Sequence, residues 1–325
     1  KLAVLLGALT ILASVGLMGT SAWLISMAAL HPSVAELGVS VVGVRFFGIS
    51  RGVFRYLERL VSHNVTFRLL AHLRVWFYEK LEPLAPARLM EFRAGDLLAR
   101  IISDVETLEN FYVRVVSPPL TAILVGLFTS RFLASYDPRL ALSLIGFFLA
   151  LGLILPALAQ TLSRRPATDL VARRAELHSQ LVDNIQGLAD VLAYGRGADR
   201  LARIASTGKA YGRSQKQMAR ITGLQSGLSV LLTNLGLWTA LVLTIPLVSR
   251  GELTGIMLAP IALLTLASFE AVTPLPLTAQ IWNAARESAR RLFEVVDTEP
   301  AVSDQFSVIS DQSPITNYEL QITDL

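Results

Sequence analysis

"KLAVLLGALTILASVGLMGTSAWLISMAAL", residues 1–30, is an almost uninterrupted apolar run in which Lys1 is the only charged side chain. A transmembrane helix needs about 20 predominantly apolar residues, and this run supplies them. The run is also longer than the apolar core of a secretory signal peptide, which measures about 7–15 residues. It therefore predicts a membrane-spanning helix at the start of the chain.

The whole chain has the composition of a membrane protein. Of its 325 residues, 53% are hydrophobic and 17% are charged, and its mean hydropathy is +0.52. Soluble domains average about 25% charged residues. Cysteine is absent from the sequence, which excludes disulfides, thiolate metal sites and a cysteine nucleophile. The net charge of +4 comes without a basic patch interleaved with aromatic residues, so nucleic acid is not an expected partner.

Further apolar stretches follow the first one, and together they predict an all-α membrane protein with six transmembrane helices. The predicted spans are residues 2–30, 34–61, 113–135, 140–162, 224–248 and 256–281. The connections alternate between a few residues and around fifty residues, at 31–33, 62–112, 136–139, 163–223 and 249–255. Both long connections have the periodicity of amphipathic helices. We therefore expect the spans to continue as long helical extensions beyond the bilayer.

Lysine and arginine predict the orientation of these spans. The long connections 62–112 and 163–223 are rich in both residues, whereas the three short turns hold only Arg139 and Arg250. The positive-inside rule places the long connections in the cytoplasm. With six spans, both termini are then expected in the cytoplasm as well.

The second span carries charge in "RFFGISRGVFRYLERLVSHN", residues 45–64. Arg51, Arg55, Arg59 and His63 follow one another in four-residue steps, each of which rotates about 40° on a helix, so all four share one broad face. Charges at membrane depth cost at least ~2.5 kcal/mol each and are candidates for function. Stacked guanidinium groups suit carboxylates, so this face is predicted to bind a small anionic substrate. Contact with lipid headgroups is the alternative, if the helix has already left the bilayer there.

Glu270 is the second outlier, because it lies in the middle of the sixth predicted span. A carboxylate at this depth is expected to face a cavity or a cation such as one of the arginines, and a purely structural ion pair is the alternative. Pro274 and Pro276 follow and predict a kink in this span. The sequence contains no spacing typical of catalytic residues or of a metal site built from protein side chains alone.

The C-terminal residues differ from the rest of the chain. Residues 301–318 are polar and predict a linker, and "NYELQITDL", residues 317–325, alternates like the start of a strand. We therefore expect a membrane domain at 1–300, a linker at 301–318 and the first strand of a truncated further domain at 319–325.

This organisation resembles the transmembrane domain of an ABC exporter of type 1 (type IV). The segments "SAWLISMAAL" (21–30), "GVRFFGISRGVFRYLERLVSHN" (43–64) and "FEAVTPLP" (269–276) are similar to the CydC half of the CydDC family of heterodimeric thiol-reductant exporters. The resemblance implies a CydD-like half-transporter as partner, glutathione or cysteine as cargo, support of cytochrome bd assembly, and a bacterial plasma (inner) membrane as location. It also implies that residues 319–325 begin a nucleotide-binding domain.

Nucleotide chemistry is not expected in this chain itself. The sequence contains no G-x-x-x-x-G-K-[ST], the loop that cradles phosphate groups. ATP and Mg²⁺ are therefore expected to act only through the missing nucleotide-binding domain. The chain alone is then not an enzyme, whereas the resemblance implies that the complete protein is an ATP-driven translocase.

Two segments are predicted to couple the membrane helices to the nucleotide-binding domains. "GDLLARIISDVETLENF", residues 95–111, resembles the region near the first coupling helix of such exporters. The residues implicated there are Gly95, Asp96, Arg100 and Asp104. The last three stand four residues apart, and we expect them to form ion pairs along an exposed face. The second predicted coupling region is residues 186–198, where Gly195 interrupts the helical pattern.

The resemblance further implies haem binding near "ERLVSH", residues 58–63. His63 Nε2 would be an iron ligand, and Arg59 and Arg55 would hold the propionates. Haem b is thus an alternative ligand, either as cargo or as the regulator of a haem-binding sensory subunit. A solvated histidine at the exit of a helix is the remaining interpretation.

Overall fold

The structure is a computed structural model that describes residues 1–31, 33–85, 100–109 and 111–298. Within these residues every regular element is a helix. The contacts between residues divide the chain into two compact units. Unit 1 comprises Lys1–Val65 and Asn110–Asn283, and unit 2 comprises Thr66–Glu109 and Ala284–Leu325.

The α-helices are α1 (Leu2–Ala28), α2 (Val34–Leu81), α4 (Val105–Glu109), α5 (Ser117–Ala134), α6 (Pro138–Leu149), α7 (Leu155–Gln186), α8 (Leu188–Ala193), α9 (Gly197–Ser249), α10 (Leu258–Ser268) and α11 (Leu275–Val296). Short 3₁₀ turns are η1 (Glu82–Leu84), η6 (Gly255–Met257) and η7 (Phe269–Ala271), and single π-type turns are η3 (Arg100–Asp104), η4 (Tyr112–Val116) and η5 (Ala150–Ile154).

Six helical stretches have the length and apolar composition to cross a membrane, as predicted. Several run well past the predicted ends of the spans. The 48 residues of α2 and the 53 of α9 correspond to about 70 and 80 Å at a rise of 1.5 Å per residue. A bilayer core is about 30 Å thick, so the expectation of long helical extensions is confirmed. α2 ends at Leu81 and continues as the 3₁₀ turn η1, because Pro83 has no N–H to donate to the carbonyl of Glu79 in the α-helical pattern.

The core of unit 1 lies where α1 packs against α5 and α10, and where α9 packs against α6 and α10. Its largest fully buried side chains are Leu133, Leu140, Leu144 and Ile261. α5 and α6 form a hairpin at the predicted turn, because the Asp137 side chain accepts a hydrogen bond of 2.6 Å from the backbone N–H of Arg139 and caps α6.

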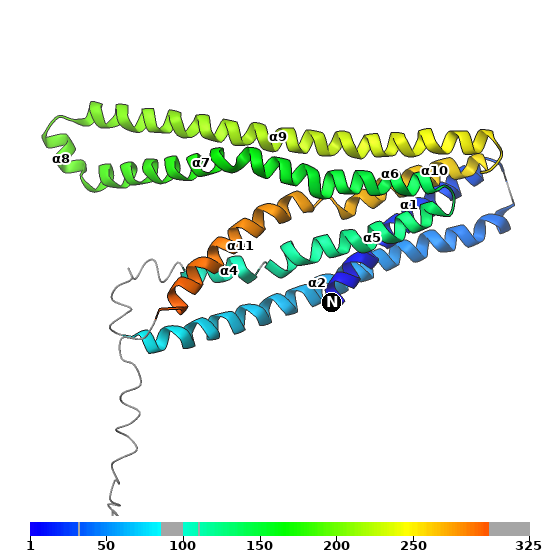
Figure 1. Cartoon of the computed structure of the whole chain (residues 1–325), viewed down its shortest axis with the longest axis horizontal. Helices are drawn as coiled ribbons and strands as arrows, with labels where there is room; N and C mark the ends of the chain where they lie inside the picture. Colours follow the sequence, from blue (N-terminus) through cyan, green and yellow to red (C-terminus); the bar gives the residue numbers. More distant parts are fainter. Residues whose placement is uncertain (32, 86–99, 110, 299–325) are drawn as a thin grey trace, which may run out of the picture. The chain divides into compact units, whose positions relative to one another are not determined.

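α7 and α9 run side by side, and the short helix α8 joins the end of α7 to the start of α9 (Figure 1). Gly195 follows α8 with a φ of 65°, a conformation that side chains other than glycine rarely adopt. The helical interruption predicted within residues 186–198 is therefore confirmed.

Glycines permit two close helix contacts in unit 1. A Cβ at Gly236 of α9 would lie 2.6 Å from the ring of Phe269, and a Cβ at Gly16 of α1 would lie 2.6 Å from the ring of Phe47. Phe269 is 3% exposed, so its ring has little room to move away. A larger residue at Gly236 would overpack the helices next to η7.

Unit 2 has a separate core, formed by Phe77, Leu81, Leu84, Val105, Leu292 and Val295. Asp104 is 4% exposed in this unit, and its Oδ1 accepts hydrogen bonds from Ser288 Oγ at 2.9 Å and from the Arg291 guanidinium. The expectation that Asp104 lies on an exposed face is wrong. Its side chain is desolvated, and donors from α11 compensate the buried charge.

Candidate functional site

The sixth span is broken in the middle. α10 ends at Ser268, the 3₁₀ turn η7 covers Phe269–Ala271, and α11 begins at Leu275. Pro274 has no N–H to donate to the carbonyl of Glu270, so the α-helical hydrogen bonds cannot continue past this point. The predicted kink is confirmed, and it places Glu270 in the turn between two helices.

Glu270 is the centre of a charge cluster in unit 1, together with Ser14, Arg51 and Arg55. Its Oε1 lies 3.4 Å from Arg55 Nη2 and 3.9 Å from Arg51 Nη2. Its Oε2 accepts a hydrogen bond of 3.0 Å from Ser14 Oγ. These four residues are called the Glu270 cluster below. The predicted pairing of Glu270 with arginine is therefore confirmed, and Ser14 is an additional partner.

The Glu270 cluster is partly open and carries more positive than negative charge. The side chains of Arg51, Arg55 and Glu270 are 32%, 55% and 38% exposed. A structural ion pair in a protein core is normally desolvated and has its hydrogen bonds satisfied by neighbours. Here two guanidinium groups share a single carboxylate and remain accessible, which leaves donors for a second anion. The arrangement favours anion binding over a purely structural role.

Two members of the predicted face lie away from this cluster. Along the axis of α2, Arg59 lies about 12 Å beyond Arg51 and His63 lies about 18 Å beyond it, at a rise of 1.5 Å per residue. Both side chains are exposed. α2 thus brings Arg51 and Arg55 to Glu270, and it places Arg59 and His63 further toward its C-terminal end.

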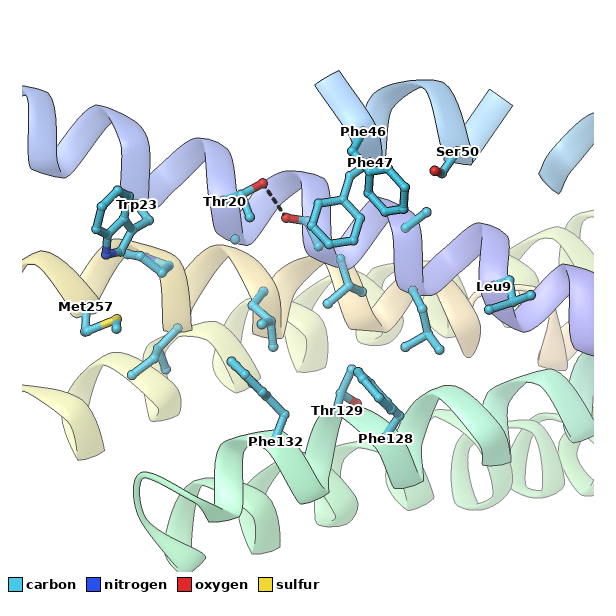
Figure 2. Close-up of a pocket in the computed structure, with 18 of the residues that line it drawn as sticks. Leu9, Thr20, Trp23, Phe46, Phe47, Ser50, Phe128, Thr129, Phe132 and Met257 are labelled. Atoms are coloured by element: carbon cyan, nitrogen blue, oxygen red, sulfur yellow. Dashed lines mark hydrogen bonds between the residues drawn. The ribbon is translucent and has the colours of Figure 1, made fainter. Parts of the chain in front are cut away.

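An apolar cavity of about 630 Å³ lies beside the cluster, lined by α1, α2, α5 and α10 (Figure 2). Figure 2 shows aromatic side chains of α2, including Phe47, facing Phe128 and Phe132 of α5. Ala13 and Phe54 also line the cavity, and they are direct chain neighbours of Ser14 and Arg55. The cavity therefore accommodates apolar groups, and two of its lining residues are next in sequence to members of the Glu270 cluster.

The predicted coupling residues are only partly covered by the structure. Gly95 and Asp96 lie outside the described residues, as does the side chain of Arg100, whose backbone begins η3. Asp104 is the buried acceptor of unit 2, and Gly195 lies in the link between α8 and α9. Their coupling role stays a prediction, as do the linker at 301–318 and the strand at 319–325, which lie outside the described residues too.

Sequence reasoning missed Ser14 and the aromatic cavity. A hydroxyl in an apolar span is a weak signal, because it usually bonds a carbonyl of its own helix. Thr10 does so one turn earlier, donating to the carbonyl of Leu6 at 2.8 Å. The cavity residues resemble ordinary lipid-facing aromatics in sequence, and only the helix packing turns them toward one another.

Comparison with known proteins agrees with this architecture. The ABC transporter transmembrane region matches residues 2–270. A relative in Escherichia coli (strain K12), the glutathione/L-cysteine transport system ATP-binding/permease protein CydC, is 31% identical over 99% of this chain and 57% of its own length. The CydC protein of Haemophilus influenzae is 30% identical over 89% of this chain and 51% of its own length. The CydD protein of Bacillus subtilis is 34% identical over 60% of this chain and 34% of its own length.

The chain thus spans about half the length of the CydC relatives that it matches. The family match covers most of the chain and includes the helices that build the Glu270 cluster. The described residues also contain the six apolar helical stretches expected of a multi-pass membrane protein. The chain therefore belongs to the family of ABC transporter transmembrane regions, as a CydC-like exporter membrane domain.

Proposed function

We propose that this chain is the membrane domain of a half-transporter that exports a small thiol reductant, glutathione or L-cysteine. The observation that carries the proposal is the Glu270 cluster, where Arg51 and Arg55 share one carboxylate inside the spans. Both reductants carry carboxylates, which suit accessible guanidinium groups. The names of the CydC and CydD relatives support the same cargo.

In this proposal the substrate carboxylate competes with Glu270 for the arginines. Arg55 is the more accessible of the two, and its contact with Glu270 is weak at 3.4 Å. A substrate carboxylate that engages Arg55 loosens Glu270 from the cluster on the α2 side, while Ser14 of α1 still donates to it. Because Glu270 lies in the turn between α10 and α11, this exchange of partners biases the angle between the two helices.

The complete transporter needs parts beyond this chain. We infer a CydD-like half-transporter as partner and nucleotide-binding domains that bind ATP and Mg²⁺. In this arrangement the cytoplasm of a bacterial cell contains both termini and the long extensions of α2, α7 and α9. This placement follows from the positive-inside rule, because arginine and lysine are concentrated in the long connections. The segments around Asp104 and α8 then transmit nucleotide-driven movement to the spans.

Transport of labelled glutathione tests the cargo and the site together. The assay is ATP-dependent uptake into inverted vesicles that contain the full-length protein and its partner half-transporter. Arg55→Gln removes a charge-assisted hydrogen bond of about 1.5–3 kcal/mol, so we expect uptake at low substrate to fall at least about tenfold. Arg139→Gln, which alters an exposed arginine in the first turn of α6, is the matched control and leaves uptake unchanged. Equal uptake by Arg55→Gln and the unaltered protein would refute the assignment.

Haem b is the second candidate ligand, held by Arg59 and His63. The two side chains are exposed one helical turn apart on α2, and they supply an imidazole for iron and a guanidinium for a propionate. When bound there, haem would supply redox or sensory chemistry in a regulatory subunit. Haem titration of the purified pair of half-transporters tests this: His63→Ala should abolish the Soret shift, Arg55→Gln should weaken haem binding because Arg55 is the other predicted propionate partner, and Arg139→Gln should leave the spectrum intact. An unchanged spectrum in both His63→Ala and Arg59→Ala refutes the haem site.

A further inference from the structure

A second cavity of unit 1 has a very different lining from the aromatic one. It measures about 480 Å³ and lies among α7, α9 and the first turns of α11. Its polar side chains are Gln160, Ser163, Arg164, Thr222, Gln225 and Asn283. This set is called the polar pocket below. Its size falls within the range of about 300–1,000 Å³ that is typical of small-molecule sites.

Gln225 is the most informative residue of the polar pocket. Its side chain is 9% exposed, it lines the pocket, and no hydrogen bond to its amide is present among the described residues. Each unmet hydrogen bond of a desolvated amide costs about 1–3 kcal/mol, so an unpartnered amide favours a ligand that supplies the missing bonds. Among the described residues, the side-chain atom that is both fully enclosed and without a partner is Oε1 of Gln180. The amide atoms of Gln225 are therefore not fully enclosed. Gln225 therefore lines the pocket with an amide that has no hydrogen-bond partner among the described residues.

The charge of the polar pocket indicates which ligand it accepts. Arg164 is its charged residue, and none of the described lining residues is acidic. Amides and hydroxyls next to it provide both donors and acceptors. A guanidinium combined with amides fits a small molecule that has a carboxylate and peptide groups. The pocket offers no negatively charged side chain among its described lining residues that would bind a cation.

The position of the pocket relates it to the Glu270 cluster. Arg164 and Gln225 lie at the polar ends of the predicted fourth and fifth spans, on the side where α7 and α9 leave the membrane. Pro276 of α11 also lines the pocket and is only six residues after Glu270. A ligand in the pocket thus contacts the helix that begins at the break in the sixth span.

We propose that the polar pocket is a second binding site for the exported substrate, a small peptide that carries a carboxylate. The substrate occupies this pocket before it reaches Arg51 and Arg55. Arg164 binds a carboxylate of the substrate, and Gln225 binds one of its amide groups. This inference rests on the proposed function for the identity of the ligand. It predicts two kinds of glutathione site in the transporter, which separate variants can remove.

The experiment measures binding of labelled glutathione to the full-length protein and its partner half-transporter, in nanodiscs of phosphatidylcholine. Arg164→Gln should weaken one class of site by about ten- to a hundredfold, and Gln225→Leu should weaken the same class by about two- to tenfold. Gln225→Glu keeps the size of the side chain, adds a repelling charge and should abolish that class. The matched controls are Arg165→Gln and Gln215→Leu, which alter exposed residues of the same helices that do not line the pocket.

The outcomes separate this inference from the proposed function. If Arg55→Gln removes glutathione binding while Arg164→Gln and Gln225→Glu leave number and affinity of the sites unchanged, the polar pocket is not a substrate site and the proposed function stands. If the pocket variants remove one class and Arg55→Gln removes none, the pocket stands and the Glu270 site fails. A phospholipid headgroup is the competing anion. If Gln225→Glu releases co-purified phosphatidylglycerol without changing glutathione binding, the inference is overturned.

Discussion

Replacing Glu270 by glutamine should tighten the binding of an anionic substrate, although it removes a residue of the site. The carboxylate of Glu270 neutralises part of the positive charge of Arg55 and Arg51, on which the proposed binding of an anionic substrate depends. Glutamine has nearly the same size and can still accept the hydrogen bond of Ser14, which measures 3.0 Å. The substitution therefore changes mainly the charge of the cluster.

The magnitude follows from the two ion pairs. Partly exposed ion pairs contribute about 0.2–1 kcal/mol each. The contact of Arg51 with Glu270 is 3.9 Å long, at the limit of an ion pair, so the 3.4 Å contact of Arg55 dominates. Release of about 1 kcal/mol corresponds to about fivefold tighter binding, since 1.4 kcal/mol is tenfold. Arg55→Gln acts in the opposite direction and should weaken binding about tenfold or more.

The assay is equilibrium binding of labelled glutathione to the full-length transporter in nanodiscs, at two salt concentrations. Added salt should reduce the difference between Glu270→Gln and the unaltered protein, because the cluster is partly exposed and is screened. Glu252→Gln is the matched control, since Glu252 forms a comparable ion pair of 4.0 Å with Arg250 in a short turn. Weaker binding by Glu270→Gln at both salt concentrations would contradict the competition between Glu270 and the substrate.

Three further changes test the packing around the site. Gly236→Ala places a Cβ against the buried ring of Phe269 and should destabilise the protein by about 1–3 kcal/mol in thermal unfolding. Gly212→Ala, on the same helix with open space around it, should be neutral or stabilising by up to about 1 kcal/mol. Equal changes in unfolding temperature for Gly236→Ala and Gly212→Ala would contradict the close contact with Phe269. Asp104→Asn weakens the hydrogen bonds from Ser288 and Arg291 of α11 and should lower the free energy of unfolding by about 1.5–3 kcal/mol. Amide hydrogen exchange in residues 284–296 should become faster, and unchanged exchange would argue against the buried pair. Pro274→Ala restores a backbone donor at the break and should slow transport with substrate affinity preserved, so an unchanged transport rate would show that the break is not needed for movement.

The amino-acid sequence by itself determined the membrane class, the six spans and their helical extensions. These features depend on local properties, namely the length of apolar runs, the helical period and the positions of proline and glycine. The YDPR turn and the break before Pro274 were predictable for the same reason. The importance of Arg51, Arg55 and Glu270 was also visible, because charge is rare and costly in an apolar span.

Only the tertiary structure decided which of these groups meet. Ser14 and Glu270 are 256 residues apart in the chain, and Arg55 and Glu270 are 215 apart. No local pattern distinguishes Arg55, which reaches Glu270, from Arg59 one turn later, because both occupy the same broad face of α2. The burial of Asp104 and the unpartnered amide of Gln225 likewise depend on which helices pack around them. Side-chain periodicity specifies a face of a helix, whereas the depth and rotation of that helix against its neighbours specify the partners.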